Sequence, residues 1–332
     1  MYTFSSKLKT FSLILMAVGL LGIGYGFYTA PKDIKEVEAL LAAESHGGHA
    51  AVKHEATEAH EVKAEAPIEK GHEATEAHEA EQSHEMKAKA PIEKAHEATE
   101  THEGDAHAEH EAHLTHVLHQ LQNKPWAALY VACIFFLLIS MGTLAFYAIQ
   151  QVAQAGWSPV LFRVMQGITA YLPVGSVLFF VFLILSGLHF NHLFVWLGEG
   201  VTDPNSANYD HIIAGKAGYL NFPFWIVRAA IFLIGWNAYR YYFRKNCLAQ
   251  DEADDNLNYK KNFKMSAGFL VFFIVSESIM SWDWIMSIDP HWFSTLFGWY
   301  VFASFFVSGI TMIAMVTLYL KSKGYLEHVN TS

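Results

Sequence analysis

Three carboxylates interrupt an apolar stretch near the C-terminal end of the sequence. Glu277, Asp283 and Asp289 follow the run 265–275, whose composition is that of a membrane-spanning helix. On insertion scales a charged group at the bilayer centre costs about 2.5–3.5 kcal/mol, so such a group faces the protein interior or a water-filled cavity. Carboxylates in those places relay protons or bind substrates. The three acids are therefore candidates for a proton path.

The spacing of these acids limits how they act together. With a rise of 1.5 Å per residue, Asp283 lies about 9 Å and Asp289 about 18 Å beyond Glu277 along a helix. Six residues turn the helix by about 600°, so successive acids point roughly 120° apart. A path through all three needs water or neighbouring helices. A purely structural role competes for Asp289, which precedes Pro290 at a helix end, and for Asp283.

Arg228 is the expected partner of Glu277. It lies about nine residues, roughly 14 Å, below the outer end of its span, at a depth close to that of Glu277. A buried carboxylate requires a compensating cation. We therefore expect the two spans to be adjacent and Arg228 to pair with Glu277.

His189 and His192 are three residues apart and would share a helix face. One interpretation is a quinol site, in which a histidine accepts a proton from a hydroxyl group. A haem or metal pair is a second, although histidines so spaced on one helix do not bracket a haem iron. Packing histidines with structural hydrogen bonds are the third. All three interpretations stay open.

The composition predicts an all-α membrane protein. Hydrophobic residues make up 52% of the chain and charged residues only 16%. We expect about six transmembrane helices: an N-terminal anchor, a four-helix bundle and one further helix. The expected spans are 11–28, 126–149, 171–197, 219–243, 265–288 and 293–320. They divide the chain into an anchor (1–30), a linker (31–120) and a transmembrane domain (121–325).

The distribution of basic residues predicts the topology. Lys7 and Lys9 precede the first span, which we interpret as an uncleaved anchor, not a cleaved signal. The positive-inside rule then places both termini in the cytoplasm and the linker outside. The same rule agrees with the basic residues of the later cytoplasmic loops, such as Arg244 and Lys261.

The linker is rich in histidine and glutamate. His-Glu-Ala-Thr-Glu-Ala-His occurs at 54–60 and 72–78, with a close copy at 96–102, and 14 of the 19 histidines lie between 31 and 120. Because the segment has few residues that could form a core, we expect it to be mostly disordered. It is either a solvated tether or a weak metal or proton buffer; histidines six apart fall on different sides of a helix, which favours the tether.

The sequence contains no Cys-x-x-Cys-His haem motif, no iron–sulfur spacing and no glycine-rich nucleotide fingerprint. Cys133 lies in an apolar run and Cys247 in a basic region, so we expect no disulfide between them. We expect no metal, no covalently bound cofactor and no nucleic-acid partner. Any redox centre must then belong to another subunit.

The stretch from Ser281 to Thr295 resembles the quinone-type membrane subunits of bacterial alternative complex III, in particular the second of the two. The stretch 218–225, Gly-Tyr-Leu-Asn-Phe-Pro-Phe-Trp, and the histidine-rich linker point the same way. The resemblance covers about 120–320. It implies membership of the polysulfide-reductase-like (NrfD-like) family, which is built from two four-helix bundles. The six spans here supply only one, so any site between bundles would be incomplete.

The resemblance implies a subunit of a quinol:cytochrome c oxidoreductase in the bacterial inner membrane. The implied partners are a sister NrfD-like subunit, a multihaem cytochrome c subunit, an iron–sulfur subunit and an associated terminal oxidase. Haem and iron–sulfur clusters would sit on those partners, and the substrate would be a quinol such as menaquinol, bound preferentially by the sister subunit. It also implies a proton half-channel, to which four residues correspond by position: Glu277, Asp283, Asp289 and His291.

Two other functions fit the same residues. Intramembrane carboxylates and an arginine also suit a proton- or cation-coupled secondary transporter, although the spans show no internal repeat. The polar groups of a structural anchor would only bind neighbouring subunits. We expect no catalysis from the chain alone in any of the three cases.

Overall fold

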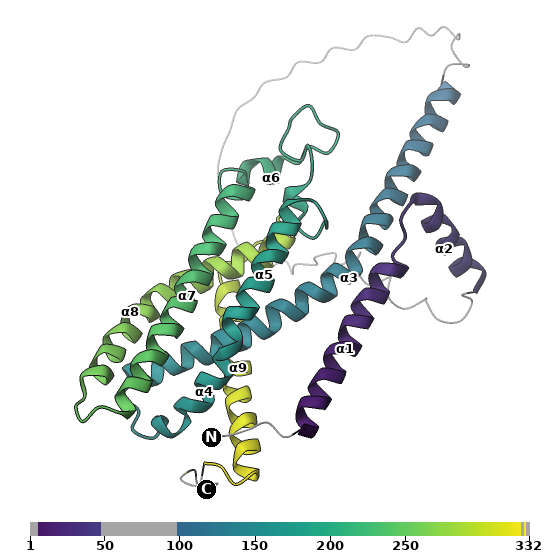
Figure 1. Ribbon diagram of the computed structural model, residues 1–332. Coiled ribbons are helices and arrows are strands. Elements are labelled where there is room, and N and C mark those ends of the chain that lie inside the picture. Colours follow the sequence, from purple (N-terminus) through teal and green to yellow (C-terminus); the bar gives the residue numbers. More distant parts are fainter. Residues whose placement is uncertain (1–5, 48–97, 327–328, 330–332) are drawn as a thin grey trace, which may run out of the picture. The chain divides into compact units, whose positions relative to one another are not determined.

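A computed structural model describes residues 6–47, 98–326 and 329, and within these ranges the chain forms helices and turns but no strand. Figure 1 shows the α-helices: α1 (Ser6–Thr29), α2 (Ile34–Gly47), α3 (Ala98–Val152), α4 (Phe162–Ile168), α5 (Leu172–Gly187), α6 (His211–Lys216), α7 (Phe222–Asp251), α8 (Leu257–Met280) and α9 (Phe297–Ser322). Six helical stretches in this part of the chain are long and apolar enough to cross a membrane. The predicted all-α, polytopic architecture is confirmed.

The chain divides into two units, residues 31–120 and residues 1–30 with 121–332. In the first, α2 begins at a reciprocal cap: the Asp33 carboxylate accepts from the Glu36 amide at 2.9 Å, and the Glu36 carboxylate accepts from the Lys32 amide at 2.7 Å. Residues 98–120 are also helical. Both ends of the predicted disordered linker thus differ from expectation, because alanine and glutamate favour helix. The repeats at 54–60 and 72–78 lie outside the described residues.

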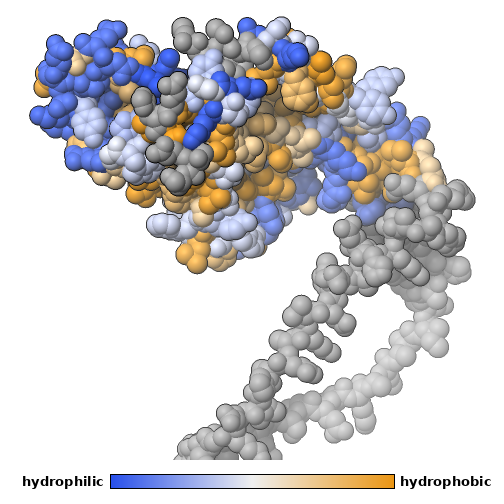
Figure 2. All heavy atoms as spheres, turned by 90° about the horizontal axis from the view of Figure 1, so that it is seen from below, coloured by the Kyte–Doolittle hydropathy of each residue, from blue (hydrophilic) through white to orange (hydrophobic). Residues whose placement is uncertain are grey.

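The second unit, called the membrane unit below, is built around the C-terminal half of α3. Leu137, Met141 and Leu144 on this helix are at most 1% exposed. Around it, α5 contacts α7, α7 contacts α8, α8 contacts α9, and α9 contacts α4. The predicted adjacency of the fourth and fifth spans, α7 and α8, is therefore correct. Figure 2 shows hydrophobic residues over the middle of this unit and hydrophilic ones toward the turn between α7 and α8.

Two glycines allow α3 and α9 to cross closely. A Cβ atom on Gly309 would lie 2.7 Å from the backbone nitrogen of Thr143 and 2.8 Å from the carbonyl carbon of Gly142. A Cβ atom on Gly142 would lie 2.3 Å from the carbonyl oxygen of Phe305. Small residues at such crossings let helix backbones approach within a membrane. These glycines fix how α9 lies on the central helix.

The third span ends earlier than predicted. We expected a helix over 171–197, but α5 ends at Gly187 because His189 has a φ of 61°. The amide of His189 donates to the carbonyl of Ser186, and the amide of Phe190 donates to that of Leu185. This is a Schellman motif with histidine where glycine is usual. It prevents His189 and His192 from sharing a helix face.

The fifth span also leaves α-helical geometry near its C-terminal end. After α8 the chain forms one π-helical turn, Ser281–Ile285, and then a 3₁₀ turn, Met286–Ile288. Asp289 has an extended backbone. The even 120° steps expected between the three acids therefore do not continue as far as Asp289.

Candidate functional site

A buried ion pair joins α7 to the π turn. Nε of Arg228 donates to Oδ2 of Asp283 at 2.6 Å, and Nη2 donates to Oδ1 at 2.9 Å. The side chains are 8% and 0% exposed, respectively. Two parallel hydrogen bonds between a guanidinium and a carboxylate make the strongest form of this contact. The pair thus neutralises both charges inside the bundle.

The guanidinium is enclosed by aromatic rings. Its central carbon lies 4.0 Å from the ring centre of Tyr219 and 4.2 Å from that of Phe224. The remaining nitrogen, Nη1 of Arg228, donates to the carbonyl of Tyr219 at 3.2 Å. Ring faces attract a cation, more strongly where water is excluded. Burial and the adjacent Asp283 carboxylate raise the pKa of Tyr219, so its hydroxyl stays protonated.

Side chains from three elements bind carbonyls of the π turn. Nε1 of Trp225 donates to the carbonyl of Asp283 at 2.9 Å, and Oγ of Ser287 donates to the same oxygen at 2.6 Å. The hydroxyl of Tyr130, on α3, donates to the carbonyl of Trp284. A π turn displaces backbone carbonyls from regular helical bonding and commonly marks a functional site. Here these donors hold Asp283 facing Arg228.

Glu277 lies on α8, six residues before Asp283, and is buried with 5% exposure. Its Oε1 accepts from the hydroxyl of Ser278 at 3.0 Å, whereas its Oε2 is buried without a hydrogen-bond partner. The predicted pairing of Glu277 with Arg228 is wrong. Asp283 takes Arg228 instead, because the π turn rotates its carboxylate toward α7.

On the N-terminal side of Glu277, the buried polar groups of α8 are neutral. Ser276 accepts from Nε1 of Trp236 at 2.9 Å, and the hydroxyls of Ser266 and Tyr239 lie 2.8 Å apart. Between Lys264 and Glu277 the sequence has no acidic residue. Glu277 is therefore the first carboxylate that this helix brings into the apolar span.

The other two candidate residues, Asp289 and His291, lie in the loop between the π turn and α9. Nε2 of His291 lies 2.6 Å from Oδ2 of Asp210, and Oδ1 of Asp289 accepts from the amide of His291 at 3.2 Å. Nζ of Lys216 donates to the carbonyl of Pro290 at 2.5 Å. These contacts tie the loop that contains α6 to the segment after the π turn.

Asp210 also caps α6. Its Oδ1 accepts from the amides of Ile212 and Ile213 at 2.8 and 3.0 Å. The hydrogen bond from Ile213, together with His291, lowers the pKa of Asp210. The carboxylate therefore stays charged throughout the neutral pH range.

His189 and His192 do not form a pair on one helix, because α5 ends at Gly187. Both are exposed, and the amide of His192 donates to Oδ1 of Asn123, on α3, at 2.8 Å. Within the described residues no group of three or more histidine, cysteine, aspartate or glutamate side chains could hold a metal. Cys133 and Cys247 are free thiols.

Sequence reasoning missed the aromatic and hydroxyl residues around the ion pair. Phe224 and Trp225 stand four and three residues before Arg228, a spacing that places them on the arginine's helix face. This spacing could have identified them. The role of Tyr130 could not be inferred, because 154 residues separate it from its partner Trp284.

A comparison of the chain with protein-family models finds no matching family, and a search of the curated proteins finds no match. What the chain does must therefore be inferred from its residues and their geometry.

Proposed function

We propose that this chain is a membrane subunit of a respiratory redox complex that holds no redox metal itself. More particularly, we propose that it serves a quinol:acceptor oxidoreductase of the alternative complex III type. The observation that carries the proposal is Glu277, a buried carboxylate with one oxygen that has no partner. A carboxylate with a vacant acceptor takes up a proton without breaking an existing bond. A charge at this depth that served packing alone would be unfavourable.

Under this proposal the two buried acids have different roles. Asp283 is held by its ion pair with Arg228, which joins the π turn to α7, so it has a positioning role. Glu277 exchanges the proton, and Asp289 and His291 form the outer entrance of the half-channel. Haem and iron–sulfur clusters belong to partner subunits, and the quinol is bound with the sister NrfD-like subunit. The chain lies in the bacterial inner membrane with both termini in the cytoplasm.

Purification from native membranes tests the proposal. A tagged full-length chain should co-migrate with a multihaem cytochrome c subunit and an iron–sulfur subunit, and the preparation should oxidise a quinol. A stable solitary protein that catalyses proton- or cation-coupled solute uptake would overturn it in favour of a transporter.

A structural anchor is the second candidate, and the ion pair favours it. Both carboxylate oxygens of Asp283 are satisfied within the chain, as a purely structural pair requires. Replacing Glu277 with glutamine in the intact complex separates the two candidates. Unchanged proton release during quinol oxidation would leave only the anchor.

A further inference from the structure

The N-terminal part of α3 carries histidines at a spacing that the repeats of the linker do not have. Every third residue from 107 to 119 is a histidine: His107, His110, His113, His116 and His119. Within the repeats at 54–60 and 72–78 the histidines are six apart. Residues 98–120 are helical (Figure 1), so this spacing decides which histidines are neighbours on the helix surface.

The spacing of three brings imidazoles together. Residues three apart on a helix have about 5–6 Å between their Cβ atoms, and two imidazoles at that separation can converge on a zinc ion, which binds histidine nitrogen at about 2.0–2.1 Å. Residues six apart lie about 9 Å apart along the axis and point roughly 120° away from each other. Metal-binding helices of other proteins use ligands three or four residues apart. His113 therefore has a suitable co-ligand on each side, in His110 and His116.

The side chains of His110, His113 and His116 are available to a ligand. All three residues are exposed, and none has an ion pair or hydrogen bond within the part of the chain that the structure describes. The helix packs through another side, because Leu114 is 3% exposed. Its side chain lies about 100° round the helix from His113 and about 160° from His116. The histidines are thus presented on a packed helix and stay open to solvent.

The charge of this segment favours a cation. Residues 98–120 contain no lysine or arginine, and their acidic residues are Glu100, Glu103, Asp105, Glu109 and Glu111. A surface of one sign raises the local concentration of the opposite ion. Imidazole suits zinc, copper and nickel, whereas magnesium and calcium prefer oxygen ligands. The composition therefore favours a divalent transition-metal ion.

We propose that His113 binds Zn²⁺ together with one of its neighbours, His110 or His116. The described residues bring no group of three or more metal-binding side chains together, so water completes the coordination. The bound ion links residues one turn apart and thereby stabilises this part of α3. The inference does not depend on the proposed redox function, because zinc carries no electron.

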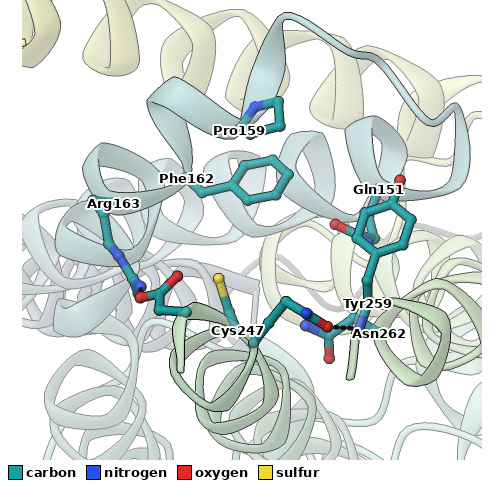
Figure 3. Close-up of a pocket in the computed structure, with 9 residues that line it drawn as sticks. Gln151, Pro159, Phe162, Arg163, Cys247, Tyr259 and Asn262 are labelled. Carbon is teal, nitrogen blue, oxygen red and sulfur yellow. Dashed lines mark hydrogen bonds and ion pairs between the residues drawn. The ribbon is translucent and has the colours of Figure 1, made fainter. Parts of the chain in front are cut away.

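Cys247 offers zinc a competing ligand in the membrane unit. Its free thiol lines a pocket of about 210 Å³, to which residues of α3, α4, α7 and α8 contribute (Figure 3). The residues that line this pocket include no histidine, and its cation, Arg163, pairs with Asp251. Zinc held there would protect no histidine, so a histidine-specific probe separates the two places.

Diethylpyrocarbonate supplies this probe, because it modifies exposed imidazoles and cannot react with a nitrogen that binds a metal. The full-length protein in detergent is treated over a series of Zn²⁺ concentrations, and mass spectrometry of its peptides measures the modification of each histidine. His113 should be half-protected at a zinc concentration at least about tenfold below that required by the histidines of the repeats, because its second ligand is already in place one turn away. Addition of a chelator should restore the modification.

Two double variants, each lacking two histidines, decide whether the spacing is responsible. His110→Gln with His116→Gln leaves His107, His113 and His119 six apart, and should raise the zinc concentration that half-protects His113 at least about tenfold. His107→Gln with His119→Gln keeps both neighbours of His113, and should change that concentration less than about twofold. Glutamine favours helix, so the segment should stay helical in both. An equal shift in the two variants, or protection of His113 no stronger than that of the repeats, would overturn the proposal.

Discussion

The guanidinium of Arg228 donates two hydrogen bonds, of 2.6 and 2.9 Å, to the carboxylate of Asp283, and both side chains are buried. This contact joins α7 to the π turn that follows α8. It leaves Glu277, on the same span as Asp283, without a cationic partner among the described ion pairs. The two buried acids therefore differ in what they can do, since one is fixed and the other has a free acceptor.

Breaking the ion pair should destabilise the bundle. Arg228→Met or Asp283→Leu alone leaves a buried charge uncompensated, and should lower the free energy of unfolding by about 3–5 kcal/mol. The double variant should lose much less than the sum of the two, because no charge remains. Unfolding of the purified protein in detergent measures each value.

Glu277 supplies the control for this cycle. Combining Arg228→Met with Glu277→Gln should give the sum of the two single effects, since the residues do not share a hydrogen bond. A coupling between Arg228 and Glu277 as large as that between Arg228 and Asp283 would contradict the observed pairing.

Tyr130→Phe tests the support of the π turn. Its hydroxyl donates to the buried carbonyl of Trp284, so its removal should cost about 1–3 kcal/mol of unfolding free energy. Tyr300→Phe, at a side chain that is 70% exposed, is the matched control and should have little effect. If both variants unfold at the same point as wild type, the Tyr130 contact does not stabilise the turn.

Gly309→Ala tests the crossing of α3 and α9. The added Cβ would lie 2.7 Å from a backbone nitrogen, so the helices must separate, and we expect a loss of about 1–3 kcal/mol. Gly268→Ala, on α8, has no atom within 4 Å of the new Cβ. It should instead be neutral or stabilise by up to about 1 kcal/mol, because alanine favours helix. Thermal unfolding of the two variants measures both effects. If Gly309→Ala were more stable than Gly268→Ala, the close crossing of α3 and α9 would be contradicted.

Asp210 allows the cap of α6 to be separated from its contact with His291. Asparagine caps helices as well as aspartate, so Asp210→Asn should keep the cap and remove the negative charge beside His291, whereas Asp210→Ala should remove both. Hydrogen exchange at the amide of Ile213 should therefore be fast in Asp210→Ala and nearly normal in Asp210→Asn. Similar exchange in both variants would show that the cap does not hold this amide.

The lowered pKa of Asp210 also sets the sign of a pH effect. Folding is favoured by the charged carboxylate above its unfolded pKa, and this contribution is lost as pH falls through the lower folded value. The loop contacts of Asp210 should thus survive mild acidification and weaken only in strong acid. Exchange at Ile213 across an acid titration measures this; weakening near neutrality would point to another group.

Much of the membrane architecture could be predicted from the sequence. Long apolar runs have few alternatives to helix in a bilayer, because their backbone groups must bond within the segment. The approximate positions of the spans followed from this. The adjacency of α7 and α8 is also correct, but it was expected from a pairing of Arg228 with Glu277, whereas Arg228 pairs with Asp283. The end of α5 could not be predicted, because the Schellman motif there has His189 in the position where glycine is usual.

The identity of the partners inside the site could be predicted only in part. If both helices were regular, Arg228 would lie at the depth of Glu277, and this predicted their pairing. The π turn changes the rotation of the residues after Met280, so Asp283 faces Arg228 instead. The periodicity of apolar residues does not predict a single irregular turn within a helix. The helical ends of the linker were missed for a different reason: low hydrophobicity indicated disorder, while alanine and glutamate favoured helix.

The central claim is that Glu277 carries a proton during quinol oxidation. The most direct measurement is the number of protons transferred per electron by the assembled complex in liposomes, compared between wild type and Glu277→Gln. Ser278→Ala, which removes only the hydroxyl that bonds Glu277, serves as the control. We predict that Glu277→Gln lowers the ratio in a fully assembled complex and that Ser278→Ala does not. An unchanged ratio in Glu277→Gln would contradict the account.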